Sequence, residues 1–408
     1  MKKTILFVHQ NFPGQYKHLA PALARKYNVH SFSMHPSDTK GVKHFRYMPY
    51  QESSKNIHLL ATEFETKILR AEACADLAYK LKDEGLNPEL IIGHAGWGEL
   101  LFLKEVWPNS KLLSYVEFHY NLYNSDIDFD KDQMLGEDKI FLRRKLIARN
   151  APNFSQYISS DYLITPTEFQ KSTFPEFVKE KITVIHEGID TDVFTPNEKM
   201  TMTVDNVTLS RKDKIILFVN RNLEPYRGYH IFLRSIPYIQ KKHPDALILI
   251  VGGDGTSYGK KPPKGETWKN IFLNEVKDQV DLSKIIFTGY LLEHKSLTAL
   301  MQMASVQVYL SYPFVVSWSL LESLSCGCLV IGSNTEPVSE IITDKKNGIL
   351  TDFFDYKEIA NKVNTVLDKP ENYNKLTETA RQHMIKNYDL KKVCLPKTVE
   401  FVENILSE

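Results

Sequence analysis

Short apolar runs alternate with amphipathic segments along the whole chain. Apolar runs of strand length occur at residues 4–8, 29–34, 89–93, 111–117, 162–165, 181–186, 215–219, 246–251, 284–288 and 328–331. Between them, segments such as residues 63–82 and 229–242 repeat apolar residues at helical spacing. Strands that alternate with helices are typical of βαβ units. The pattern therefore predicts an α/β protein built from doubly wound, Rossmann-like parallel sheets.

The succession of a strand, a loop and a helix begins twice, at the N-terminus and again at residue 214. A chain of 408 residues exceeds what one compact core usually holds, so we expect two domains. The predicted organisation is a first domain at 1–195, a linker with a β-hairpin turning at Asp205 and Asn206 at 196–213, a second domain at 214–380, and a helical segment at 381–408 that packs back on the first domain. Two facing domains of this kind enclose a cleft.

The stretch from residue 309 to 340 combines a strand, a loop interrupted by proline, a short helix and a second strand. Ser317 or Ser319 can cap the helix at its start, and Gly327 suits its end. A helix N-terminus at the carboxyl edge of a parallel sheet favours anionic ligands. The polar and aromatic loop around Trp318 is therefore a candidate anion site, with an ordinary βαβ unit as the alternative.

The composition of the chain limits the kinds of function that it can have. Hydrophobic residues make up 42% and charged residues 25% of the chain, and the net charge is +1, which gives no reason to expect nucleic-acid binding. The four cysteines form no CxxC pair, so they suggest neither a disulfide framework nor a zinc site. The apolar runs are too short for a signal peptide or a membrane span. We expect a cytoplasmic protein, soluble or peripheral at the inner membrane face.

Two charged segments leave alternatives open. Residues 124–132 together with Glu137 have the spacing of an EF-hand loop, but Lys131 stands where the sharp turn needs glycine. An exposed mobile loop is the simpler interpretation. The helix predicted at 137–149 carries the cations Arg143, Arg144, Lys145 and Arg149. That face is compatible with a membrane or an acidic acceptor, although a solvated surface explains it equally.

Several segments could carry chemistry. Arg221 and Arg227 precede a helix and suit a diphosphate, unless Glu224 and Asp254 pair with them. Residues 252–256, Gly-Gly-Asp-Gly-Thr, look like the phosphate loop of NAD and diacylglycerol kinases, although those enzymes carry it early in the chain.

A carboxylate and two histidines are further candidates. Glu322 stands three residues after Ser319, which is the spacing of a capping box, so a structural role is one interpretation. The alternative is that its carboxylate binds the vicinal hydroxyls of a sugar. His94 and His119 each follow a strand end, where a crevice or a structural role can use them.

Five segments, in order along nearly the whole chain, together resemble the family 4 glycosyltransferases of GT-B fold: residues 8–15, 92–99, 184–190, 219–228 and 312–322. The resemblance implies metal-independent transfer, with retention, of a hexose or N-acetylhexosamine from a nucleotide-sugar. A UDP-sugar is favoured over a GDP- or ADP-sugar, and no further cofactor is implied. The acceptor would be a glycan, lipid-linked or protein acceptor in surface polysaccharide or glycoconjugate synthesis.

The resemblance also implies roles for individual residues. It gives catalytic roles to His119, Arg221, Arg227 and Glu322, donor contacts to Gly14, Gly253, Tyr290, Ser317, Trp318, Ser319 and Leu320, and the acceptor side to His94 and Trp97, with no metal ligand. One departure concerns Phe314, which stands where the family's Glu-x7-Glu pattern has its first carboxylate. Another is Arg227, since the family usually has lysine there. These departures affect the expected sugar specificity more than the expected class of reaction. Two alternatives remain: residues 252–256 suggest a kinase, and Phe314 suggests a non-catalytic nucleotide-sugar-binding protein.

Overall fold

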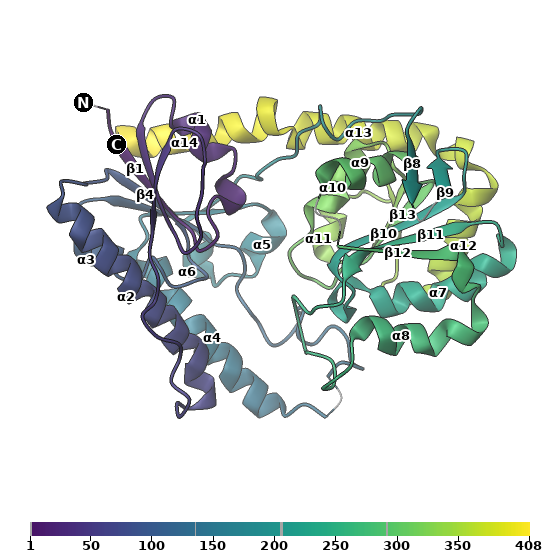
Figure 1. The fold of residues 1–408 in the computed structure, drawn as a ribbon, viewed down its shortest axis with the longest axis horizontal. Coiled ribbons are helices and arrows are strands. Elements are labelled where there is room, and N and C mark those ends of the chain that lie inside the picture. The colour runs from purple at the N-terminus through teal and green to yellow at the C-terminus, as the bar shows by residue number, and fades with distance from the viewer. Residues whose placement is uncertain (1, 135, 205–206, 291–292) are drawn as a thin grey trace. The chain divides into compact units, whose positions relative to one another are not determined.

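The computed structural model describes residues 2–134, 136–204, 207–290 and 293–408, which form two compact units (Figure 1). The N-terminal unit comprises Met1–Tyr123, Leu135–Glu187 and Lys391–Glu408, and the C-terminal unit comprises Asn124–Met134 and Gly188–Leu390. Residues 188–195, assigned to the first domain from sequence, thus lie in the C-terminal unit. The reason is packing, because the Phe194 side chain is buried in a core with Leu217 and Leu300 of that unit.

The N-terminal unit contains one sheet of seven parallel strands in the order β3-β2-β1-β4-β5-β6-β7. The strands are β1 (Thr4–Val8), β2 (Asn28–Ser33), β3 (Val42–Arg46), β4 (Leu90–His94), β5 (Lys111–Tyr115), β6 (Tyr162–Thr165) and β7 (Ile182–Val184). The chain winds outward in both directions from the central pair β1 and β4. This pair is the topological switch point, where loops diverge and ligands usually bind.

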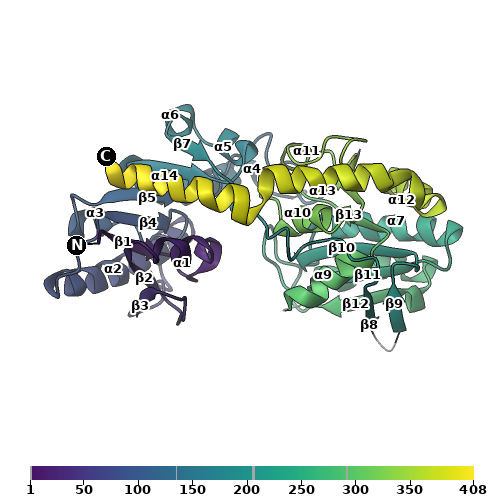
Figure 2. The same cartoon turned by 90° about the horizontal axis from the view of Figure 1, so that it is seen from above.

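Helices cover both faces of this sheet. They are α1 (Leu19–Leu23), α2 (Thr62–Asp83), α3 (Leu103–Val106), α4 (Lys139–Ser159), α5 (Glu168–Ser172), α6 (Glu176–Lys179) and α14 (Leu395–Ser407). On one face α1 and α14 lie side by side and share a core with β1 and β4 (Figure 2). On the other face α2 and α3 pack on β1 and β4. The last helix of the chain therefore completes the core of the first unit.

The C-terminal unit repeats the arrangement with six parallel strands in the order β12-β11-β10-β13-β14-β15. They are β10 (Ile215–Asn222), β11 (Leu247–Gly253), β12 (Ile285–Gly289), β13 (Val306–Tyr309), β14 (Val330–Ser333) and β15 (Ile349–Thr351). Its switch point lies between β10 and β13. A separate antiparallel pair, β8 (Thr201–Val204) and β9 (Val207–Ser210), forms the predicted hairpin, whose turn residues Asp205 and Asn206 lie outside the described residues. The predicted class, α/β with two doubly wound parallel sheets, is confirmed.

The helices of the C-terminal unit also form two layers. One layer contains α7 (Tyr229–Lys242), α8 (Trp268–Val276) and α12 (Tyr356–Asp368), which bury Phe232, Phe272 and Val363 in a common core. The other layer contains α9 (His294–Met303), α10 (Trp318–Ser325), α11 (Glu336–Ser339) and α13 (Asn374–Tyr388). Within the described residues, no helix has both the length and the apolar character that a membrane crossing requires.

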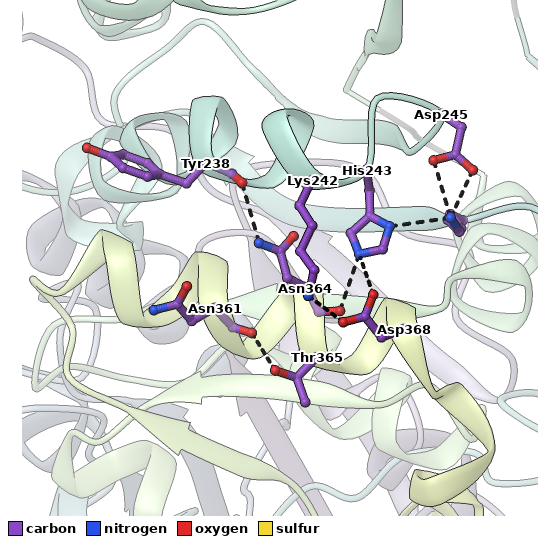
Figure 3. A network of polar contacts seen from close by, with 9 residues as sticks. Tyr238, Lys242, His243, Asp245, Asn361, Asn364, Thr365 and Asp368 are labelled. Atoms are coloured by element: carbon purple, nitrogen blue, oxygen red, sulfur yellow. Dashed lines mark hydrogen bonds and ion pairs between the residues drawn. The ribbon is translucent and has the colours of Figure 1, made fainter.

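A polar network fixes the end of α7 to α12 (Figure 3). The buried His243 imidazole follows α7, and its Nε2 lies 3.3 Å from the carbonyl oxygen of Asn364 and 3.3 Å from Asp368 Oδ1. Its Nδ1 lies 3.3 Å from Lys214 Nζ, which also pairs with Asp245 at 2.9 Å. A buried polar group is stabilising only when its partners are present. The network therefore holds α7 in place, and the other end of α7 adjoins the arginine loop described below.

The acidic segment Asn124–Met134 is not an exposed mobile loop, so that expectation was wrong. It belongs to the C-terminal unit, where Asp130 is 3% exposed and Phe129 packs against Tyr312. Asp126 accepts a hydrogen bond of 2.7 Å from the Tyr226 hydroxyl, and Asp130 accepts one of 2.5 Å from the Tyr312 hydroxyl. Tyrosine hydroxyls thus bind two of the carboxylates that have EF-hand spacing.

Candidate functional site

The loop after β10 holds the two predicted diphosphate-binding arginines. Arg221 is exposed at the end of the strand, whereas Arg227 closes a 3-10 turn (Pro225–Arg227) and is 6% exposed. Arg227 Nη1 donates a hydrogen bond of 2.8 Å to Ser311 Oγ, and its guanidinium lies 5.1 Å from the centre of the Tyr258 ring. A buried cation normally has an anionic partner. Within the described residues none lies within 4 Å of Arg227.

The acidic neighbours form no close ion pair with these arginines in the described part of the chain. Glu224 Oε2 instead accepts hydrogen bonds from the Ser257 and Tyr258 amides at 3.0 and 2.9 Å. Burial raises the pKa of Glu224 to about 7, so the carboxyl is partly protonated at neutral pH. Asp254 pairs with Lys269 at 3.5 Å. Both arginines therefore remain available to an anionic ligand at the switch point of the C-terminal unit.

Helix α10 presents the buried carboxylate predicted at Glu322. Ser317 is the N-cap residue, and its Oγ accepts from the Ser319 amide. A capping box would need its glutamate three residues after that cap, so Glu322 is not part of one. Glu322 is 6% exposed, and its carboxyl has no hydrogen-bond partner in the described part of the chain. Burial raises the pKa of Glu322 to about 7. A buried acid without a partner indicates a polar ligand.

The backbone amides at the start of α10 are less available to an anion than the sequence suggests. The amide of Ser317 donates to the Tyr309 hydroxyl at 2.7 Å, and the amides of Ser319 and Leu320 donate to atoms of Ser317. The Leu320 side chain is fully buried in the core. Trp318, in contrast, is largely exposed. A ligand can therefore reach the Trp318 ring, whereas Leu320 contributes to packing.

Phe314 replaces a carboxylate with a ring that packs on the arginine loop. Its centroid lies 4.9 Å from that of Tyr258 and 5.7 Å from that of Tyr226, and Arg227 lies 5.9 Å from it. The side chain is buried. The ring therefore shields Arg227 from water and strengthens its electrostatic interactions. It provides no hydrogen bond to a sugar.

Two further predicted donor contacts lie at the same sheet edge. Gly253 ends β11 and pairs in register with Asn222 of β10, next to Arg221. Tyr290 follows β12 and is 56% exposed. The structure thus gathers the donor-side residues of the C-terminal unit at the carboxyl ends of β10, β11, β12 and β13. Their individual roles remain predictions.

In the N-terminal unit, His94 and Trp97 line a cavity of about 280 Å³ beyond the ends of β4 and β5. Gly14 lies in the loop after β1, with φ of +48°, and a Cβ there would approach the His9 ring to 2.7 Å. The His9 ring lies 5.8 Å from that of His94. Sequence reasoning passed over His9, although its position directly after the first strand at the switch point could have indicated it.

The predicted catalytic His119 lies outside the lining of this cavity. Its ring packs against Phe154 and Phe174, at centroid distances of 5.2 and 5.9 Å, and its Nε2 lies 3.3 Å from Asn150 Nδ2. Burial lowers the pKa of His119 to about 4, so the imidazole is neutral at physiological pH. Its Nδ1 is buried and has no hydrogen-bond partner in the described structure. A catalytic role for His119 stays a prediction.

We expect Glu322→Gln to raise the melting temperature by several degrees at pH 8 and by much less at pH 5. In the folded chain Glu322 ionises near pH 7, whereas a free glutamate ionises near 4.5. Because the folded state binds the proton more tightly, stability falls as the pH rises from about 4.5 to 7. The neutral glutamine avoids this loss. Calorimetric melting curves at both pH values test the difference, and an equal shift at the two values would contradict it.

Comparisons with known proteins agree with this architecture. The family model described as "Glycosyl transferase family 4 group" matches residues 25–194, and that described as "Glycosyl transferases group 1" matches residues 203–383. Among curated proteins, the provisionally named glycosyltransferase YtcC of Bacillus subtilis is 27% identical over 54% of this chain and 55% of its own length. Spore coat protein SA of the same organism is 26% identical over 58% and 60%. The chain thus spans little more than half of the length of these relatives.

Solved structures share the fold at low sequence identity. Sucrose-phosphate synthase from Thermosynechococcus elongatus superposes with a TM-score of 0.72 at 17% identity over the whole of both chains. Anabaena HepE in complex with UDP and glucose has a TM-score of 0.65 at 14% identity, over 98% of this chain and all of that one. These likenesses confirm the GT-B class of the two units. Taken with the two matched family models, they show that the chain belongs to the group 1, family 4 glycosyltransferases.

Proposed function

We propose that this protein transfers a hexose or N-acetylhexosamine from a nucleoside-diphosphate sugar to a glycan, lipid-linked or protein acceptor. The observation that carries the proposal is the buried Arg227 guanidinium, which has no anionic partner among the described residues and lies in one loop with exposed Arg221. Two guanidinium groups at a helix start suit a diphosphate through charge-assisted hydrogen bonds. A nucleoside diphosphate would supply the charge that this loop lacks.

The arginines would act on the leaving group. As the bond between the anomeric carbon and the diphosphate breaks, negative charge grows on the diphosphate, and Arg221 and Arg227 stabilise it. The acceptor oxygen bonds to the anomeric carbon, and its proton leaves with the diphosphate. Glu322 would accept hydrogen bonds from the ribose hydroxyls. Retention of configuration, metal independence and surface glycan synthesis as the purpose rest on the family resemblance.

We expect one nucleoside diphosphate to raise the melting temperature without magnesium. Ligands that bind only the folded state stabilise it by mass action, by about 2.7 kcal/mol at a hundredfold excess over Kd. A panel of UDP, GDP, ADP, CMP and ATP identifies the base. UDP is favoured because the structurally similar HepE was solved with UDP. A response to ATP alone, dependent on magnesium and Asp254, would instead indicate a kinase.

One observation favours a second candidate, a nucleotide-sugar-binding protein without activity. Phe314 is buried at a position where the family has a carboxylate. Such a protein would bind the same nucleotide, yet it would neither hydrolyse nor transfer the sugar. Release of nucleoside diphosphate from the matching nucleotide-sugar separates the two candidates, because the transferase alone produces it.

Contact with a membrane surface has support in α4. Ile140, Arg143, Arg144 and Ile147 have the spacing of one helix face, and all four are exposed. A face that combines apolar and basic side chains suits the boundary of an anionic bilayer. We therefore retain peripheral attachment at the cytoplasmic membrane face as part of the proposal.

A further inference from the structure

The lining of the cavity in the N-terminal unit contains more basic than acidic side chains. It lies beyond β4 and β5, between α2 and α4, and its charged lining consists of Lys67, Arg70 and Arg149 with Glu63 and Glu117. His94 and Trp97 also line it. Three basic side chains therefore face two carboxylates. An excess of one sign within a partly enclosed space concentrates ligands of the opposite sign.

Lys67 is the most buried of these cations. It is 5% exposed, and its Nζ lies 3.1 Å from the neutral Asn153 Oδ1 and 3.7 Å from Glu63 Oε1. Burial lowers the pKa of Lys67, the charge of Glu63 partly offsets this effect, and the charges of Arg149 and Arg70 lower the pKa further. A buried ammonium with so little anionic contact is costly in the free protein. An incoming anion would offset that cost.

The two arginines differ in what they contact. Arg149 Nε lies 3.3 Å from Glu63 Oε1, and its guanidinium stacks 3.7 Å from the centre of the Tyr120 ring. Arg70 lies one turn from Lys67 on α2 and is half-buried, and no hydrogen bond or ion pair of its side chain occurs within the described residues. Glu63 thus contacts both Lys67 and Arg149. Arg70 forms no such ion pair in the described part of the chain and interacts with the buried Glu99 only electrostatically, so its guanidinium can still bind a ligand.

The loop after β4 is built to approach these cations. Gly98 has φ of +108°, and a Cβ there would lie 2.5 Å from the Lys67 carbonyl oxygen. Only glycine permits both the backbone conformation and this contact. The close approach sets Trp97 beside α2, and the indole Nε1 has no hydrogen-bond partner in the described structure. An unused buried donor among cations is what an oxygen-rich anion would satisfy.

We propose that this cavity is the acceptor subsite and that the acceptor carries an anionic group, a phosphate or a carboxylate, held by Lys67, Arg70 and Arg149. This inference rests on the proposed transferase function, because it assigns the second substrate of that reaction. The volume of about 280 Å³ lies at the small end of ligand sites. It suits one sugar residue with its charged group. The phosphate can belong to a soluble sugar phosphate or to a lipid headgroup.

Isothermal titration calorimetry on the full chain tests the charge requirement with inorganic phosphate, glucose 6-phosphate, glucuronate and neutral glucose. We expect at least one anion to bind saturably and glucose to bind far more weakly. Arg70→Gln should weaken anion binding by about tenfold or more, as expected for a lost charge-assisted contact. The matched variant Arg25→Gln removes an exposed arginine elsewhere in the same unit, so its affinity should stay unchanged.

A second variant and a vesicle assay complete the design. Lys67→Gln should weaken the binding of the same anion. The melting curve of this variant shows whether it is folded. If the soluble anions bind only weakly, vesicles of phosphatidylcholine with and without phosphatidylinositol test the lipid source. Sedimentation that needs phosphatidylinositol and is lost in Arg70→Gln supports the inference. Anion and vesicle binding that is equal in Arg70→Gln and Arg25→Gln would overturn it.

The outcome is separable from that of the proposed function. Nucleotide-induced stabilisation that Arg221→Ala abolishes reports on the C-terminal unit. If nucleotides bind there and no anion binding depends on Arg70, the acceptor inference fails alone. If anions bind through Arg70 and no nucleotide binds, the transferase proposal fails, and the acceptor assignment that rests on it fails as well.

Discussion

Arg221→Ala should lower kcat for sugar transfer by about 10²–10³-fold, because a group that stabilises the charge on a leaving diphosphate typically contributes about 3–4 kcal/mol to the transition state. The side chain is exposed at the end of β10. The melting temperature should therefore remain within about one degree of wild type, since surface substitutions rarely change stability by more than about 0.5 kcal/mol. Initial rates of nucleoside diphosphate release and calorimetric melting curves provide the two measurements.

Arg25→Ala is the control for this prediction. It removes an exposed arginine of the N-terminal unit, so both turnover and melting temperature should match wild type. Unchanged turnover in Arg221→Ala would remove the arginine loop from the mechanism. A large drop in melting temperature would instead show that Arg221 acts through folding.

Asp130→Ala should destabilise the C-terminal unit by about 3–5 kcal/mol, because it leaves buried polar groups without their partner. Asp130 Oδ2 accepts from the Tyr312 hydroxyl at 2.5 Å and lies 3.3 Å from His230 Nε2. Burial alone would raise the pKa of Asp130, but hydrogen bonds from His230 and Tyr312 outweigh burial and lower it. The ionised carboxylate therefore stabilises the fold above its free pKa, and this contribution disappears as the pH falls below about 4.

Asp132→Ala is the matched control, since Asp132 belongs to the same acidic segment and is exposed. Its melting temperature should lie close to that of wild type. Asp130→Asn keeps the shape of the side chain but loses its charge, so its melting temperature should lie between those of Asp130→Ala and Asp132→Ala. Equal melting temperatures for Asp130→Ala and Asp132→Ala would show that the acidic segment does not hold the unit together.

Much of the fold could be predicted because its elements carry local signals. Helix α7 spans residues 229–242 as expected, since an amphipathic run follows Gly228 directly. Strand β3 was missed, because Val42–Arg46 contains two basic residues and a histidine, and no apolar run. Helix α4 extends to Ser159, ten residues beyond the expected end at Arg149, with Pro152 inside it. Tertiary packing of Tyr157 overrides the local signal there.

The candidate site was predictable where residues directly follow strands. Arg221, Gly253 and His94 lie at strand ends, so topology alone brings them to a sheet edge. Lys67 and Arg70 could not be identified in this way. They lie within the long helix α2, whose alternation of charges looks like a solvated face. Only the packing of α4 and of the loop at Gly98 encloses them.

The division of the chain into units has a consequence for the order in which it folds. The chain passes from one unit to the other four times, between residues 123 and 124, 134 and 135, 187 and 188, and 390 and 391. During translation, Asp126 and Asp130 are therefore synthesised long before the tyrosines whose hydroxyls they bind. The ribosome makes α14, which completes the N-terminal core, only after the last residue of the C-terminal unit, Leu390. The N-terminal unit therefore cannot mature as an independent domain before the C-terminal unit has been made, so we infer that the N-terminal core is the later of the two to reach its final form.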